Sequence, residues 1–433
     1  MKTLNMVFSA PSMFRINPQK WQSNEILNER FISIQENTIK KIKQKCQEIL
    51  PEFGCKISLL FNAYTEASMS DFFVKQRNYG FDMIYADSGG LQMVTLGKEI
   101  NRDTMTSIYH TQRNSDIAMS FDEIPAKTIG DKTSLANVES RLFIPSLVEQ
   151  CATKTANNIV DQCKYLLEYD RPKVLFITQG NNLEDVVEWV ERGISIIPQD
   201  LWDAKVGGFA LGSPCIGSGE QESLENMIAY LTIINKYPER DKGVVHLLGY
   251  GSVQRLIPSI ELFSTHFVKD DAELTFDSTS LSMTYMMGKW TRWDGKAVSV
   301  TTDAEARAVF TEVLDFVEDI FVEQFPDFDK NVFVDYLVKH RMSTTRTTQV
   351  DVWESDGIEA WAKCFVPAYT LYQVICLWNG FRLKLEADNI LIRSANDCQT
   401  IDELHKWFYN NRSLFRSKRV LREPTNPVDG FFS

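Results

Sequence analysis

Three aspartates in this chain stand where they could act together on one substrate. Asp87 follows the apolar run "FDMIYA", Asp122 follows "DIAMSF", and Asp277 follows "LTF". Two carboxyl groups that face each other suit displacement at an anomeric carbon, where one is the nucleophile and the other donates and accepts the proton. Taken singly, each aspartate could equally be a turn residue, because Asp often ends strands.

Other polar and small residues recur at equivalent places, directly after short apolar runs. They are Gln179, Gly212 with Ser213, Gly249, and Ser278 beside Asp277. Acids, an amide and glycines gathered at one edge of a sheet can hold a flat, hydrogen-bonding ligand close to backbone. Their recurrence favours a common site over a set of unrelated turns.

The apolar runs are predicted to be eight strands, with amphipathic helices between most of them. The predicted strands are 5–11, 55–64, 82–88, 116–123, 173–180, 207–214, 244–251 and 274–280. Strands that alternate with helices form a parallel sheet, and eight such units over roughly 280 residues match a (β/α)8 TIM barrel. An open doubly wound sheet is the alternative, although the chain lacks a GxxxxGK[ST] segment and a helix-opening GxGxxG segment.

The pattern changes near residue 300, beyond which helices predominate. Helical periodicity is predicted over 301–325, 329–342, 357–385 and 400–423. We therefore expect a catalytic barrel over 1–300 and a mainly helical C-terminal region over 301–433. This second region is also the candidate surface for a nucleic acid.

Charge limits how such a surface could work. The chain has a formal net charge of -12, so the whole molecule repels a polyanion and a nucleic acid would need a local basic patch. The best candidates are cations of the tail that are interleaved with aromatic side chains: Lys406, Arg412, Arg416, Lys418 and Arg419. The alternative is that these cations lie on a solvated amphipathic helix without a binding role. The basic run at 39–45 is likewise expected to be an exposed helix face.

Composition excludes two further classes of protein. The eight cysteines are scattered without a CxC or CxxC spacing, which predicts reduced thiols and gives no local metal signature. No window approaches the ~18 apolar residues of a membrane span, and the N-terminus lacks a signal-type apolar core. We expect a cytoplasmic protein, in the host cytoplasm if it is phage-encoded, with no metal and no membrane partner.

The motifs around the aspartates resemble those of the tRNA-guanine transglycosylase superfamily. "DSGGLQMVTLG" resembles the family's DSGG[FY]Q segment, and "SDIAMSFDEIP" resembles its SDIxMxFDEC segment. In the same order follow "ITQG", "GFALGSPCIGSGE", "LLGYGS" and "LTFDSTS", which are similar to VQGG, G[YF]AIGGLxVGE, LMGVG and DMFDCVxP. Six motifs in order over roughly residues 80–290 are far more specific than any one of them.

This resemblance implies an enzyme that exchanges guanine in a polynucleotide for a 7-deazaguanine base, such as a preQ0-type substrate. It implies that Asp277 is the nucleophile at C1′ and that Asp87 is the general acid and base. It further implies that Asp122 accepts hydrogens from the guanine edge, while Gln179 and the backbone near Gly212 serve its O6 side. Such roles need two carboxyl groups and a third acid that reads the base.

Several positions depart from the family pattern. Leu91 replaces an aromatic residue and Leu248 replaces a methionine, so the base would lie between aliphatic side chains. The loop "GSPCIGSGE" carries Ser213 and a proline where the family has GGLxVGE, and "SLSMTYMMGKW" has lost a basic run. The family's CxCxxC zinc site is absent, and Cys364 and Cys376 are poorly spaced to replace it.

These departures favour the divergent branch of the superfamily that modifies DNA, in bacteria and phages, over the branch that modifies tRNA. The partners we expect are therefore DNA, or else tRNA, with a homodimer as a possible assembly. Two other hypotheses stay open: a non-catalytic barrel subunit that binds nucleic acid, and a hydrolase that uses the same carboxyl pair with water. His246 lies on a predicted strand and is expected to be a satisfied core residue.

Overall fold

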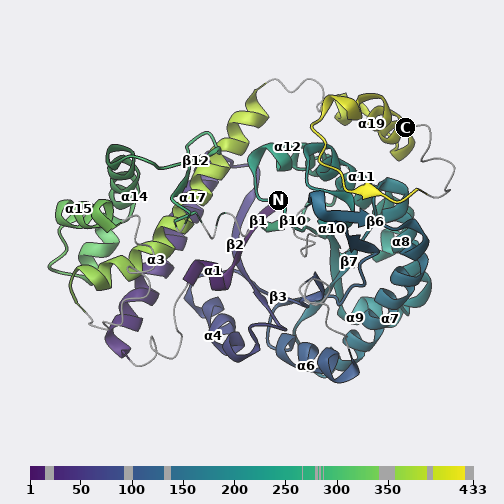
Figure 1. Ribbon diagram of the computed structural model, residues 1–433, viewed down its shortest axis with the longest axis horizontal. Coiled ribbons are helices and arrows are strands. Elements are labelled where there is room, and N and C mark those ends of the chain that lie inside the picture. Colours follow the sequence, from purple (N-terminus) through teal and green to yellow (C-terminus); the bar gives the residue numbers. More distant parts are fainter. Residues whose placement is uncertain are drawn as a thin grey trace.

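A closed barrel of eight parallel strands forms the centre of the protein (Figure 1). The computed structural model describes residues 1–14, 24–91, 101–130, 138–265, 267–277, 281, 284–285, 287–340, 356–387 and 394–424. The barrel strands are β1 (Thr3–Ser9), β2 (Gly54–Asn62), β3 (Ile84–Asp87), β4 (Ile117–Met119), β7 (Lys173–Thr178), β8 (Val206–Leu211), β9 (Val244–Leu247) and β10 (Glu273–Asp277). Each overlaps one predicted strand, so the (β/α)8 prediction is confirmed and the open sheet is excluded.

The ring closes in the order β1-β10-β9-β8-β7-β4-β3-β2. Alternate side chains of each strand face the barrel interior, as a pleated strand requires. On β7, for example, Leu175 and Ile177 belong to a small interior cluster, whereas Val174 and Phe176 pack into the larger core beneath the helices. Burial on both faces explains why these strands appear in the sequence as unbroken apolar runs.

Helices surround the barrel on its outside. They are α1 (Ala10–Phe14), α3 (Glu25–Ile49), α4 (Ser70–Lys75), α6 (Arg102–Gln112), α7 (Val148–Leu166), α8 (Leu183–Ile196), α9 (Gln199–Lys205), α10 (Ser213–Ile216), α11 (Glu220–Lys236) and α12 (Val253–Phe263). Their starts obey local rules: the side chains of Asn24, Asn101 and Asn182 cap α3, α6 and α8 through backbone N–H groups. Short 3-10 turns occupy 67–69, 76–79, 138–140, 145–147 and 238–240.

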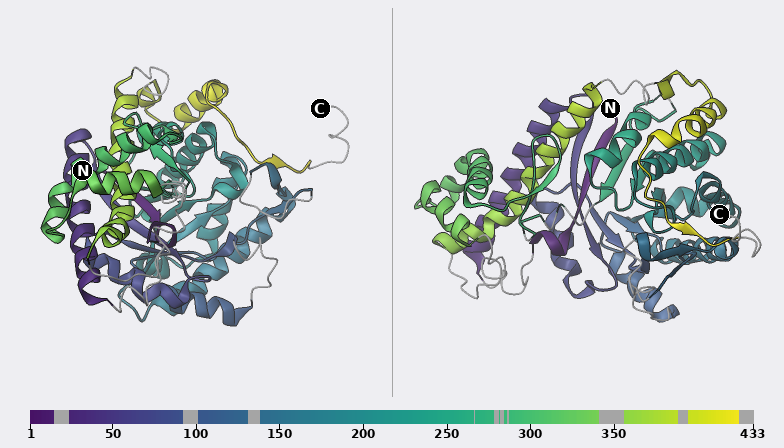
Figure 2. Two further views of the ribbon diagram at one scale, coloured as in Figure 1. Left: turned by 60° about the vertical axis from the view of Figure 1, so that its left-hand side comes forward. Right: turned by 45° about the horizontal axis from the view of Figure 1, so that its top comes forward.

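The described part of the C-terminal region contains four more helices: α14 (Asp303–Gln324), α15 (Lys330–His340), α17 (Ile358–Glu386) and α19 (Ile401–Asn411). The views of Figure 2 show α17 running alongside α3, and α17 also contacts α12. Side chains of α17 are buried from Ala360 to Phe381, and Trp378 packs against Phe276 of β10 with ring centroids 6.2 Å apart. Helix α17 thus closes the outer ring between α12 and α3, although it lies beyond residue 300.

Three features of the C-terminal half and the loops were not predicted. A hairpin joins β11 (Lys289–Thr291) to β12 (Ala297–Ser299), and a small sheet joins β5 (Ala126–Thr128), β6 (Arg141–Phe143) and β13 (Leu421–Arg422). The predicted helix over 400–423 is wrong beyond Asn411, because a 3-10 turn at 412–414 leads into an extended tail. Strands of two or three residues are too short to give a periodic signal.

Among the helices that the structure describes, we find none long and apolar enough to cross a membrane. Helix α17 is apolar on all sides because the barrel and α3 bury it.

Candidate active site

The carboxyl ends of the barrel strands bring the three predicted aspartates together. Asp87 ends β3, Asp277 ends β10, and Asp122 follows β4. The charge of Asp277 raises the pKa of Asp87, and the charge of Asp87 raises the pKa of Asp122. Side chains that perturb one another in this way share one electrostatic environment.

The surroundings of Asp87 give its carboxyl group a pKa at which it can change protonation state near neutral pH. Its Oδ2 accepts a hydrogen bond from Asn62 Nδ2 at 3.1 Å, and Asn62 lies directly beside it in the register of β2 and β3. Burial, followed by the charge of Asp277, raises the pKa of Asp87 to about 6, although N–H groups of Gly89 and Ser88 oppose this rise. A carboxyl group with such a pKa is suited to donate and accept a proton.

Asp122 and Gln179 form a buried pair at the side of the site. Gln179 Nε2 donates to Asp122 Oδ2 at 2.6 Å, and Asp122 is 5% exposed. Burial raises the pKa of Asp122 to about 7 against the opposing effect of the Gln179 hydrogen bond. Gln179 Oε1 is buried without a partner among the described residues, so one acceptor of this pair is still available to a ligand.

Two glycines make room for this pair. A Cβ at Gly212 would lie 2.7 Å from both Gln179 Nε2 and the carbonyl oxygen of Thr178, and a Cβ at Gly90 would lie 3.1 Å from Asp122 Oδ1. A side chain at either position would push the acid or the amide out of place. Gly90, the second glycine of the "DSGG" motif, therefore leaves space for the carboxylate of Asp122 as well as for a ligand.

Among the described residues, donors contact only one oxygen of Asp277. Its Oδ1 accepts the backbone N–H of Gly249 at 2.8 Å and lies 3.2 Å from His246 Nε2. The Asp277 side chain is 15% exposed, whereas that of His246 is fully buried. His246 is satisfied at both nitrogens, as the sequence suggested, but one partner is the predicted nucleophile, which sequence reasoning missed. Asn62 was missed in the same way.

No protein-family profile matches this chain. A queuine tRNA-ribosyltransferase of Ralstonia pickettii (strain 12J) is 28% identical to it over 200 residues, which are 41% of this chain and 48% of the relative. The chain therefore shows distant similarity to a queuine tRNA-ribosyltransferase. It spans about half the length of the relative it matches. This similarity over 200 residues supports the resemblance of the motifs to the superfamily.

The two leucines that depart from the family pattern lie in different apolar surroundings. Leu248 is half-buried against the interior cluster of the barrel, and Leu91 is half-buried against the outer core. Gly249 is exposed with a φ of 78°, which favours glycine. Ser213 begins α10 after β8, and Ser278 lies outside the described residues.

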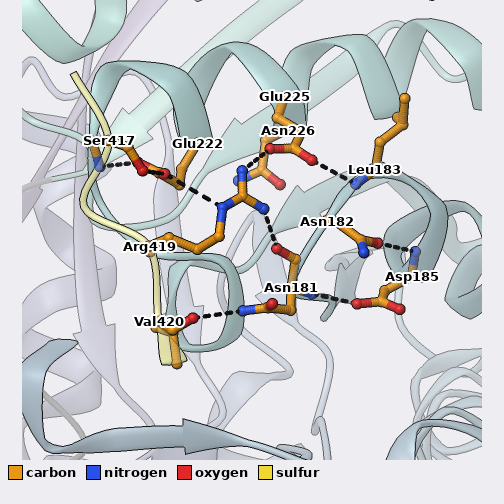
Figure 3. A network of polar contacts seen from close by, with 12 residues as sticks. Asn181, Asn182, Leu183, Asp185, Glu222, Glu225, Asn226, Ser417, Arg419 and Val420 are labelled. Atoms are coloured by element: carbon orange, nitrogen blue, oxygen red, sulfur yellow. Dashed lines mark hydrogen bonds and ion pairs between the residues drawn. The ribbon is translucent and has the colours of Figure 1, made fainter. Parts of the chain in front are cut away.

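The C-terminal tail of this chain is attached to the loops of the barrel, as Figure 3 shows. The Arg419 guanidinium donates to Glu225 and to the carbonyl oxygen of Asn181, and it lies 3.7 Å from Glu222. Because both glutamates are buried, Arg419 is held in an internal ion pair and is not presented to a phosphate. The other tail cations of the prediction are exposed: Lys406, Arg412, Arg416 and Lys418.

The tail also fixes the loop that follows β8. Ser218 N donates to the carbonyl oxygen of Lys418 at 3.1 Å, and Val420 N donates to that of Ile216 at 3.3 Å. Asn181 Nδ2 bridges the two segments, because it donates to the carbonyl oxygens of Cys215 and Val420. Tail residues 418–420 thus help to position residues 215–218, which follow Gly212 in the loop after β8.

Metal ligands were not predicted for this chain. All eight cysteines are free thiols, and within the described ranges no group of three or more His, Cys, Asp or Glu side chains could hold a metal ion.

Proposed function

We propose that the protein is a guanine transglycosylase that exchanges guanine in a polynucleotide for a 7-deazaguanine base. The observation that carries this proposal is the arrangement of three electrostatically coupled aspartates. Asp277 accepts hydrogen bonds on a single oxygen from the residues that the structure describes, Asp87 has a pKa of about 6, and Asp122 is paired with Gln179 at a pKa of about 7. Distant relationship to a queuine tRNA-ribosyltransferase supports the same chemistry.

The reaction proceeds in two displacements. A carboxylate oxygen of Asp277 attacks C1′ of the nucleotide, and guanine leaves with the electron pair of the C1′–N9 bond while it takes the proton of Asp87. The resulting glycosyl ester is then attacked by N9 of the incoming base, which gives its proton to the Asp87 carboxylate. Asp277 leaves with the electron pair of its ester bond, so both aspartates return to their starting states.

Base recognition falls to Asp122 and Gln179. An ionised Asp122 accepts the two hydrogens that guanine and 7-deazaguanines present on their N1 and exocyclic amine edge. Gln179 and the backbone near Gly212 serve the O6 side. A base without these donors would leave a buried carboxylate unpaired, which costs several kcal/mol and excludes it. Leu248 and Leu91 would bound the flat faces of the base.

DNA is the polynucleotide we favour, because Lys406, Arg412, Arg416 and Lys418 are exposed cations, Arg412 lies over the ring of Tyr409, and the sequence lacks the zinc motif of tRNA-acting relatives. Cations and rings suit an unpaired or flipped-out target. The specific observation in favour of tRNA is the substrate in the relative's name, so tRNA is the second candidate.

The decisive test traps the glycosyl enzyme. The protein is incubated with labelled guanine and, separately, with duplex DNA and tRNA, and adducts are sought on denaturing gels. We expect label in DNA and a denaturant-stable adduct that is lost in Asp277→Asn. Label in tRNA alone would transfer the proposal to tRNA. Release of base without incorporation would indicate a hydrolase, and no adduct with either polynucleotide would indicate a non-catalytic barrel.

A further inference from the structure

A chain of hydrogen bonds runs through the barrel interior and ends on Asp277. His246 of β9 lies between two residues of the neighbouring strand β10. Its Nδ1 is 2.5 Å from Thr275 Oγ1, and its Nε2 is 3.2 Å from Asp277 Oδ1. The register of the two strands places Thr275 directly opposite His246, and both side chains are fully buried. The imidazole therefore cannot exchange either partner for water.

The identity of these partners determines where the imidazole proton lies. A carboxylate oxygen only accepts hydrogen bonds, so His246 Nε2 must carry a hydrogen at its contact with Asp277. The other nitrogen then accepts from Thr275 in the neutral ring. The second-nitrogen partner of a histidine commonly selects the tautomer in this way.

The other hydrogen bonds of this buried network agree with this tautomer of His246. Asn5 Nδ2 lies 3.3 Å from Tyr85 Oη and 2.6 Å from Glu273 Oε1. Because the carboxylate of Glu273 requires a donor, the orientation of the Asn5 amide is fixed, and Tyr85 Oη accepts from it. The hydroxyl hydrogen of Tyr85 is then free, and the neighbouring hydroxyl that interacts with Tyr85 is that of Thr275. The hydroxyl hydrogen of Thr275 is in turn free for His246.

At the opposite end of the barrel, the hydrogen-bond network starts at an ion pair. Lys56 Nζ donates to Glu273 Oε2 at 2.5 Å, and Glu273 is the first residue of β10, of which Asp277 is the last. Lys56 and Asn5 both donate to Glu273, so the donors that point toward the predicted nucleophile are those of Thr275 and His246. Such a connected set of buried hydrogen bonds holds its members in one arrangement.

The two oxygens of Asp277 consequently differ. Oδ1 receives both the Gly249 N–H and the His246 Nε2–H, while no donor from the described residues reaches Oδ2. We propose, on the basis of the proposed function, that His246 is a positioning residue that directs Oδ2 of Asp277 at C1′ and keeps Oδ1 as the carbonyl oxygen of the glycosyl ester.

This arrangement favours the second displacement in particular. When the C1′–Oδ2 bond breaks, its electron pair passes to the departing carboxylate, and negative charge develops on both carboxylate oxygens. The two donors at Oδ1 stabilise that charge without any rearrangement. Removal of one such preorganised donor in other enzymes lowers kcat by about 10²–10³-fold. The hydrogen bonds of His246 are to Thr275 and Asp277 and not to Asp122, so base binding at Asp122 is not expected to change.

The test compares His246→Phe, which removes the donor, with His246→Gln, whose amide can place a donor at the former Nε2. We expect kcat for base exchange to fall about 100-fold in His246→Phe and to recover at least tenfold in His246→Gln, with the KM for guanine within about twofold of wild type. The trapped adduct should decay more slowly in His246→Phe. His405→Phe, at a half-buried histidine bonded to Thr232, is the matched control and should leave kcat unchanged.

A second measurement does not depend on catalysis. Imidazole ¹⁵N spectra of histidine-labelled wild-type protein should contain one neutral Nε2–H ring that is absent from His246→Phe. An Nδ1–H tautomer would overturn the inference whether or not the protein exchanges bases. Exchange by the wild type with an unchanged kcat in a folded His246→Phe would also overturn it. No exchange by the wild type, with the Nε2–H ring present, would instead refute the proposed function.

Discussion

Replacing Asp122 by asparagine should stabilise the protein at alkaline pH. The pKa of this carboxyl is about 7 in the folded protein, mainly because of burial, against 3.8 for the free side chain. The folded state therefore disfavours the ionised form, and at 1.36 kcal/mol per pKa unit the cost is about 4 kcal/mol once the group is fully ionised. Asparagine avoids this cost and can still accept the hydrogen bond of Gln179.

The sign of the pH dependence follows from the direction of the shift. Because the folded pKa is raised, the folded state binds more protons than the unfolded state between about pH 4 and pH 7. Wild-type stability falls as pH rises through this window, whereas that of Asp122→Asn does not. The difference in the free energy of unfolding should grow by about 2.5 kcal/mol in favour of the variant between pH 5 and pH 8.

Urea unfolding of both proteins at pH 5, 6, 7 and 8 measures this difference. Asp200→Asn, at an exposed carboxylate of α9, is the control and should stay within about 0.5 kcal/mol of wild type at each pH. A gap between Asp122→Asn and wild type that is constant, or that shrinks as pH rises, would refute the reasoning that burial controls this carboxyl.

Three further outcomes are expected. The KM for guanine should rise about tenfold from pH 8 to pH 6, because protonation of Asp122 near pH 7 removes the acceptor; steady-state kinetics against pH would detect a flat profile. Arg419→Ala should lower the free energy of unfolding by about 3 kcal/mol, since it leaves Glu225 buried and unpaired; an effect no larger than that of exposed Lys418→Ala in urea unfolding would argue against it. Gly90→Ala should raise the KM for guanine about threefold or more, because its Cβ crowds Asp122 Oδ1; an unchanged KM would contradict the close approach.

The eight strands could be located from the sequence because the parallel barrel buries both faces of each strand. Because of that burial, every strand is a continuous run of apolar residues in the sequence. The polar residue that ends the run lies at the carboxyl end of the strand, where the candidate site is. Asp87, Asp122, Gln179 and Asp277 were identified for this reason. Their roles were suggested by motif order and not by geometry.

The contacts between strands could not be obtained in the same way. Asn62 supports Asp87, and His246 holds Asp277, yet neither residue carries a local signal, because each is one polar side chain on an otherwise apolar strand. Which strands are neighbours, and in what register, decides these pairs. Both depend on closure of the whole ring.

The C-terminal tail shows the same limit more strongly. Its cations looked like a binding surface in the sequence, but Arg419 pairs with Glu225 and the segment lies along the loop after β8. A basic residue in a sequence does not reveal whether it pairs in the folded protein with a buried acidic residue that is distant in the sequence. The sequence by itself therefore determined the barrel, the strand ends that form the candidate site and the residues placed there. Only the tertiary structure decided which side chains orient the acids and which cations remain exposed, because those contacts join residues that are distant in sequence and carry no local pattern.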